Sequence, residues 1–113
     1  MPITNQRLQD HKFLDEMYRD GYFPDHVVDM GKLILIRLCE RIESEKPSDL
    51  EGLYKLTHAA TEEFNDLQEV FEENGSELET AARDCIGGDF DQIALAYGFT
   101  DADLEELIAT RDW

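Results

Sequence analysis

The chain contains little cysteine, proline or uninterrupted apolar sequence. Two cysteines and three prolines among 113 residues are too few for a disulfide framework, a collagen-like repeat or a proline-rich linker. The strongly apolar run Leu33–Ile36 is far shorter than the ~20 residues that span a bilayer. A secretory leader pattern is also missing. We therefore expect a cytoplasmic protein with no membrane-spanning segment.

Basic residues are scarce too. The sequence has 10 lysines and arginines against 27 aspartates and glutamates, a formal net charge of −17. Such a field repels phosphate backbones and anionic lipids, so we expect no binding to nucleic acid or to a membrane. The imbalance is uneven, because residues 1–61 hold 11 acidic and 8 basic side chains whereas residues 62–113 hold 16 and 2.

What remains is the composition of an ordinary globular domain, 42% hydrophobic and 33% charged, at a length suited to one core. We expect a single all-α domain over residues 1–113. The expected fold is a compact irregular bundle of five to six helices, in which two long central helices are covered by shorter C-terminal ones. Turns of two to four residues would force successive helices to pack against each other.

Capping motifs and glycine stops set the expected helix limits. Ser-x-x-Glu capping boxes begin the third and fourth helices at Ser48 and Ser76. The fifth and sixth begin at Asp89 and Thr100, and the fourth ends at Gly87–Gly88. The expected helices span about residues 5–19, 25–45, 49–73, 77–86, 90–97 and 101–108.

Apolar residues in the two longest segments recur every three or four positions, the period of a helix. The second segment carries Val27, Met30, Ile34, Leu38 and Ile42 on this period. Leu33 and its neighbours add apolar surface around the same segment, so we expect a helix covered on several sides. The third segment continues the pattern with Phe64 and Leu67. We expect these two residues, with Ile34 and Leu38, to form the centre of one core.

No pattern of nucleophilic or metal-dependent catalysis occurs in the chain. Apolar neighbours should raise the pKa of the Cys39 thiol, and Asp84 with its acidic surroundings disfavours a thiolate at Cys85. His58 and Glu62 have the spacing of a metal-ligand pair, but a zinc site needs three or four ligands. We expect no catalytic residue, cofactor or metal.

Polar residues of the third helix share a strip beside its apolar seam: Tyr54, His58, Thr61 and Asn65. One interpretation is that they bond neighbouring helices and fix the packing. The alternative is a polar cleft in a small-molecule or metal-binding domain, or in an enzyme. Both interpretations stay open at this point.

Acidic side chains gather on the third and sixth helices: Glu62, Asp66, Glu69, Glu73, Asp101, Asp103, Glu105 and Glu106. They form either a solvating surface or a docking face for a basic protein. Among the functions considered, we favour a non-enzymatic interaction module that docks a basic partner through this acidic half, as immunity proteins and antitoxins do.

Several segments resemble a family of small acidic bacterial proteins classed as a domain of unknown function. They are LTHAATEEFNDLQ (residues 56–68), AYGF (residues 96–99) and the ending IATRDW (residues 108–113). The resemblance extends over nearly the whole chain beyond His11. It implies a bacterial cytosolic origin and assigns no catalytic or ligand-binding residue.

Overall fold

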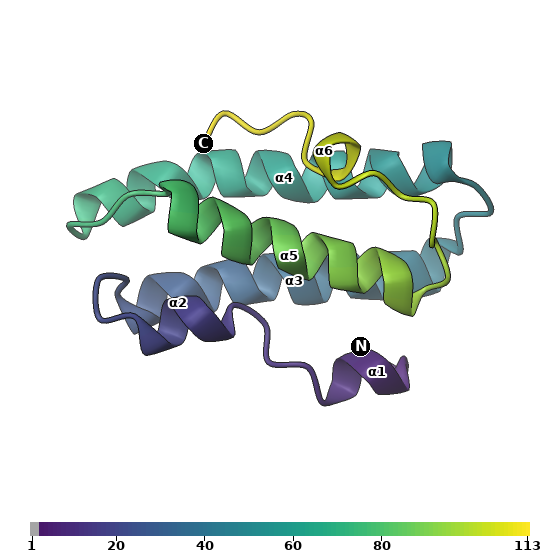
Figure 1. Ribbon diagram of the computed structural model, residues 1–113, viewed down its shortest axis with the longest axis horizontal. Coiled ribbons are helices and arrows are strands. Elements are labelled where there is room, and N and C mark those ends of the chain that lie inside the picture. Colours follow the sequence, from purple (N-terminus) through teal and green to yellow (C-terminus); the bar gives the residue numbers. More distant parts are fainter. Residues whose placement is uncertain (1–2) are drawn as a thin grey trace.

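Two long antiparallel helices, α3 (Asp25–Glu45) and α4 (Leu50–Glu73), form the centre of the fold (Figure 1). α5 (Thr80–Ala96) runs lengthwise along one side of this pair, and α6 (Leu104–Leu107) packs on α4 and α5. The short helices α1 (Gln6–Gln9) and α2 (Asp15–Arg19) precede α3 and also pack on α5. This computed structural model describes residues 3–113, which measure 40 × 27 × 20 Å and contain no strand. The all-α bundle with two long central helices is confirmed.

The limits of α3 agree with the sequence prediction. Pro24 is its N-cap, where a missing N–H leaves no helical hydrogen bond unmade. Lys46 ends the helix in a left-handed conformation with φ of 49°, directly before Pro47. A proline disfavours helical geometry in the residue before it, so these local signals are sufficient to end the helix.

The single helix expected over residues 5–19 is wrong, because the chain forms α1 and α2 there. Asn5 caps α1, and α2 begins after Leu14. Between them, the carboxylate of Asp89 on α5 accepts a hydrogen bond from the Leu14 amide at 2.6 Å and lies 2.7 Å from His11 Nε2. Leu14 has a positive φ of 57°, which an α-helix of L-residues does not accommodate in its interior. A side chain from a distant helix therefore interrupts this segment.

The expected break at Gly87–Gly88 is also wrong, since α5 continues through both residues. Gly87 is buried, and a Cβ there would lie 3.5 Å from Leu104 and 3.6 Å from Ile108. Gly87 therefore lies where the segment around α6 packs on the helix, whereas no atom lies within 4 Å of a Cβ at Gly88. Asp89 begins no new helix, because its carboxylate faces the start of α2 instead.

The caps expected at Ser48 and Thr100 are wrong as well. Asp49 caps α4, its carboxylate accepting a hydrogen bond from a first-turn amide at 2.8 Å, and Asp103 caps α6 in the same way. In both cases an aspartate lies closer to the helix than the expected serine or threonine. A carboxylate makes the stronger, charge-assisted bond at the positive end of a helix.

Ser76 opens no helix but completes the end of α4. Its backbone amide donates to the carbonyl of Phe71 at 2.9 Å, in the Schellman arrangement built around Gly75. Gly75 has φ of 86°, a conformation that L side chains disfavour. The expected end of this helix at residue 73 is therefore confirmed, while the capping box after it is wrong.

Replacing Gly88 by alanine tests the continuity of α5. Gly88 is exposed, and no atom lies within 4 Å of the position that its Cβ would take. Alanine loses less backbone entropy in a helix interior, so Gly88→Ala should stabilise the protein by about 0.5–1 kcal/mol in denaturant unfolding. Gly75→Ala is the control, and its positive φ should make that substitution destabilising. A less stable Gly88→Ala variant would show that α5 is broken at this residue.

The centre of the core lies where the apolar period predicts it. Ile34, Leu38, Phe64 and Leu67 are all buried. Phe64 is enclosed by aromatic rings from the C-terminal part of the chain, with the ring centroids of Phe90 and Trp113 each 6.1 Å from its own.

One expectation about α3 is wrong. Met30 and Leu33 are 43% and 53% exposed, although the apolar pattern predicted cover on several sides of the helix. Helices α2 and α5 pack on the inner side of α3, and no other element among residues 3–113 covers these two side chains. The outer side of the α3–α4 pair is therefore open.

Candidate interaction surface

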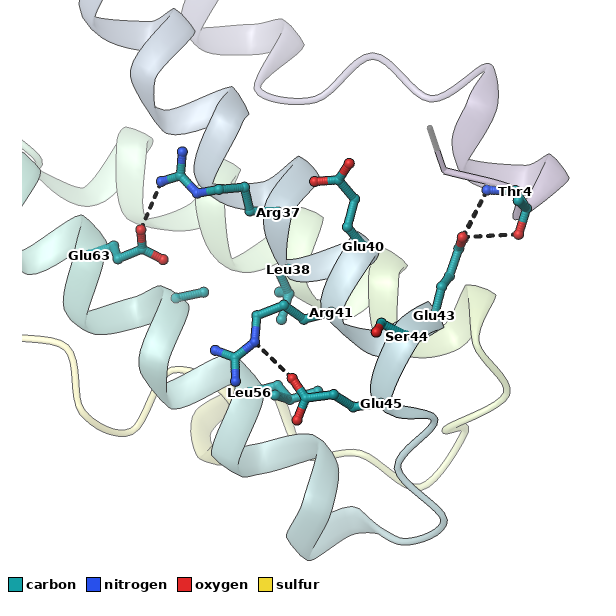
Figure 2. Close-up of a pocket in the computed structure, with 11 residues that line it drawn as sticks. Thr4, Arg37, Leu38, Glu40, Arg41, Glu43, Ser44, Glu45, Leu56 and Glu63 are labelled. Carbon is teal, nitrogen blue, oxygen red and sulfur yellow. Dashed lines mark hydrogen bonds and ion pairs between the residues drawn. The ribbon is translucent and has the colours of Figure 1, made fainter. Parts of the chain in front are cut away.

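An open groove runs between α3 and α4, on the side of the pair that faces away from α5 (Figure 2). Its larger basin has a volume of about 610 Å³. Leu38, Leu56 and Ala60 form an apolar floor, and charged side chains of both helices form the rim. The three floor residues belong to the hydrophobic core, and α5 packs on the opposite side of that core.

A second basin of about 310 Å³ continues the groove toward the start of α3. Ile34 and Leu67 lie at its base, and the exposed side chains of Met30 and Leu33 stand at its edge. The two basins share the residues Arg37 and Glu63, whose ion pair joins the helices at the point where the basins meet. We call this feature the α3–α4 groove.

Ion pairs at the surface cross or flank the α3–α4 groove. Arg37 Nη2 lies 2.8 Å from Glu63 Oε1 and joins the two helices, whereas Arg41 Nε lies 2.9 Å from Glu45 Oε2 on α3 itself (Figure 2). The four side chains are about half exposed. Exposed pairs of this kind contribute about 0–1 kcal/mol, so a ligand could open them at little cost.

The four acidic residues expected on the third helix do form one exposed row along α4. We call Glu62, Asp66, Glu69 and Glu73 the acidic row. No lysine, arginine or hydrogen-bond donor of residues 3–113 pairs with any of them. Glu62 with Asp66, and Glu69 with Glu73, stand four residues apart, so each pair of like charges destabilises the helix. Asp66 also lines the α3–α4 groove.

The acidic residues expected near the sixth helix are exposed but are partly engaged in the fold. Asp103 caps α6, and its backbone amide donates to the Tyr54 hydroxyl at 3.1 Å. Glu105 Oε2 lies 3.5 Å from Arg111 Nη1. Glu106 lies beside His58, which contacts its backbone carbonyl at 2.7 Å. The structure thus separates these residues from the acidic row, which has no such internal role.

The polar strip of α4 holds the C-terminal segment of the chain. His58 contacts the Glu106 carbonyl, and Asn65 donates to the Thr110 carbonyl at 3.0 Å while accepting from the Asp112 amide at 3.0 Å. Thr61 and Tyr54 add further hydrogen bonds to residues of the same segment. The chain's own backbone therefore occupies the strip that could otherwise have formed a ligand cleft, and the packing interpretation accounts for all four residues.

Glu43 ties the N-terminal segment to α3 and was not singled out by sequence reasoning. Its carboxylate accepts hydrogen bonds from the Thr4 amide at 3.0 Å, from the Asn5 amide at 3.1 Å and from the Tyr97 hydroxyl at 2.5 Å. Burial alone would raise the pKa of Glu43, but these hydrogen bonds to its ionised form lower it below the usual range. No local spacing predicts these partners, because they come from two distant parts of the chain, the N-terminal segment and the end of α5.

Asp89 is a second polar residue that sequence reasoning assigned wrongly. Burial raises its pKa, and the hydrogen bonds from Leu14 and His11 oppose that shift. One signal could have identified it, since Asp89 follows Ile86 by three residues and precedes Ile93 by four, which places a carboxylate on the buried face of α5. A buried acid needs a partner, and here it binds the start of α2.

Neither cysteine is set up as a nucleophile. Burial raises the pKa of the Cys39 thiol to about 12 and that of the Cys85 thiol to about 11, so both are protonated at neutral pH. Both are free, and residues 3–113 contain no group of three or more histidine, cysteine or acidic side chains placed to hold a metal. His58 Nε2, the candidate partner of Glu62 in a metal pair, faces the Glu106 carbonyl.

Together, the fold and this surface define an all-α domain whose outer side combines an apolar groove with unpaired acidic side chains. Residues 7–113 match the profile of a family described as a family of unknown function (DUF5713), and the chain belongs to that family. No curated protein and no solved structure matches the chain. Within the part that the structure describes, no helix is both long and apolar enough to cross a membrane.

Proposed function

We propose that this protein is a non-enzymatic interaction module that docks a basic protein through the acidic row of α4, in the manner of immunity proteins or antitoxins. The observation that carries this proposal is the absence of any internal cation for the row among residues 3–113. Four aligned carboxylates that repel one another weaken α4 slightly, and they have no evident structural use. The negative field would steer a basic protein toward this face.

The acidic residues from 101 to 106 extend the negative field near the first half of α4, where the C-terminal segment lies. We assign them a supporting part, because Asp103, Glu105 and Glu106 already hold that segment in place. Substitutions in the acidic row should consequently weaken partner binding without destabilising the fold.

Reversing charge in the acidic row tests the proposal. Glu62→Lys with Glu69→Lys turns both like-charge pairs into attractive ones, so the variant should melt at a higher temperature than the parent. The same variant should lose basic proteins that the parent captures from a lysate at low salt and releases in a salt step. Opposite changes in stability and in capture are the expected result.

The matched control is Asp10→Lys with Asp84→Lys, which makes the same change in net charge at exposed positions outside the row. This control should keep the captured proteins. If the row variant captures the same proteins as the parent, the acidic surface only solvates the protein and the docking proposal fails.

A further inference from the structure

The α3–α4 groove has the chemistry to specify which part of a basic partner binds. Its floor is apolar, whereas its rim carries five acidic residues and two arginines. Both arginines are already paired, with Glu63 and Glu45. Five acidic side chains against two arginines leave the net charge of the groove negative, as is that of the acidic row beside it.

We infer that the partner presents an amphipathic helix whose apolar side chains enter the α3–α4 groove and whose lysines or arginines lie over the acidic side chains of α4. This inference rests on the proposed function, because it specifies the segment through which the basic partner is held. Recognition would follow the helix-in-groove mode, with apolar anchors three or four residues apart.

The dimensions of the α3–α4 groove suit such a helix. Its lining residues on α3 extend from Met30 to Glu45, which corresponds to about 22 Å at 1.5 Å per residue. A docked helix of roughly 15 residues has the same length. Met30 and Leu33 stand exposed at one end of this path and would be covered by the anchors.

The charges also favour a cationic helix over a second copy of this chain as the occupant of the α3–α4 groove. Two copies would each bring a net charge of −17 to the contact and would repel each other. A cationic helix removes that repulsion. It can also replace Arg37 as the partner of Glu63, because the Arg37–Glu63 pair is exposed and weak.

Two peptides of leucine and lysine serve as probes for this inference. The first is about 18 residues long and repeats leucine at helical spacing to form one apolar face. The second has the same composition in a shuffled order without such a face. The first peptide should bind more tightly, and its titration should shift the methyl resonances of Leu38 and Leu56 while leaving those of Leu8, which lies on α1 outside the groove, unchanged.

Met30→Gln with Leu33→Gln removes the apolar edge of the α3–α4 groove without changing its charge. Both positions are exposed, so the variant should keep the melting temperature of the parent. It should bind the amphipathic peptide about tenfold more weakly and the shuffled peptide with unchanged affinity. Tyr22→Gln is the matched control, because Tyr22 is 47% exposed and lines neither basin, and it should bind as the parent does.

The results separate this inference from the proposed function. Equal binding of the two peptides, unchanged by Met30→Gln with Leu33→Gln, would overturn the groove inference and leave electrostatic docking on the acidic row in place. Binding that depends on Met30 and Leu33 but not on Glu62 and Glu69 would overturn the acidic docking and the basic partner with it. A parent dimer that becomes monomeric in the Met30→Gln, Leu33→Gln variant would make the occupant a second copy and overturn the inference.

Discussion

Phe64→Ala should lower the free energy of unfolding by about 3–5 kcal/mol, the range measured when a buried aromatic is truncated in a packed core. Phe64 is fully buried and packs against the rings of Phe90 and Trp113, each with its centroid 6.1 Å away. Removal of its ring opens a cavity where α4, α5 and the C-terminal segment meet. A domain of this length has roughly 6–17 kcal/mol of stability in all, so the loss is severe.

Denaturant or thermal unfolding followed by circular dichroism measures the effect of Phe64→Ala. Glu69→Ala, at an exposed position of the same helix, is the control and should stay within about 0.5 kcal/mol of the parent. A Phe64→Ala variant that melts within a degree or two of the parent would mean that this face of α4 does not point into the core.

Trp113→Ala should produce the second largest loss, about 3 kcal/mol, although the residue lies in a segment without regular structure. Trp113 is 6% exposed and its indole packs on Phe64, while its main-chain oxygen accepts a hydrogen bond from Arg83 Nε at 3.0 Å. The side chain thus anchors the segment that runs along α4 after α6. Loss of this anchor should also increase amide hydrogen exchange in that segment.

Trp113→Phe is the matched variant. The indole N–H is buried and finds no hydrogen-bond partner among residues 3–113, so phenylalanine keeps an aromatic ring and removes an unsatisfied donor. We expect Trp113→Phe to lose less than half as much stability as Trp113→Ala. Equal losses in the two variants would show that the ring itself contributes little packing.

The part of the candidate surface that was predictable is the acidic row, because charge and helical spacing are local properties. Glu62, Asp66, Glu69 and Glu73 fall on one side of any helix that spans them. The α3–α4 groove was not predictable in this way. The apolar period of α3 indicates which residues can be buried, but it does not say that no element covers Met30 and Leu33.

The polar strip of α4 is a second feature whose use could not be predicted from helical spacing. The spacing of Tyr54, His58, Thr61 and Asn65 predicted a shared face and left its use open. The structure assigns that face to the C-terminal segment, through contacts such as that between Asn65 and Thr110, 45 residues apart in sequence. The partners of a polar side chain depend on which distant segment packs there, and this information is absent from a window of one or two turns.

The sequence by itself determined the fold class, the length of α3, the stop after α4 and the residues at the centre of the core. These features depend on proline, glycine and apolar period, whose effects reach about four residues along the chain. The tertiary structure decided the division between α1 and α2 and the continuity of α5. Asp89 reaches Leu14 across 75 residues, and Gly87 lies beneath Leu104 and Ile108. At these places a buried hydrogen bond and a close helix contact outweigh local propensities worth about 1 kcal/mol or less.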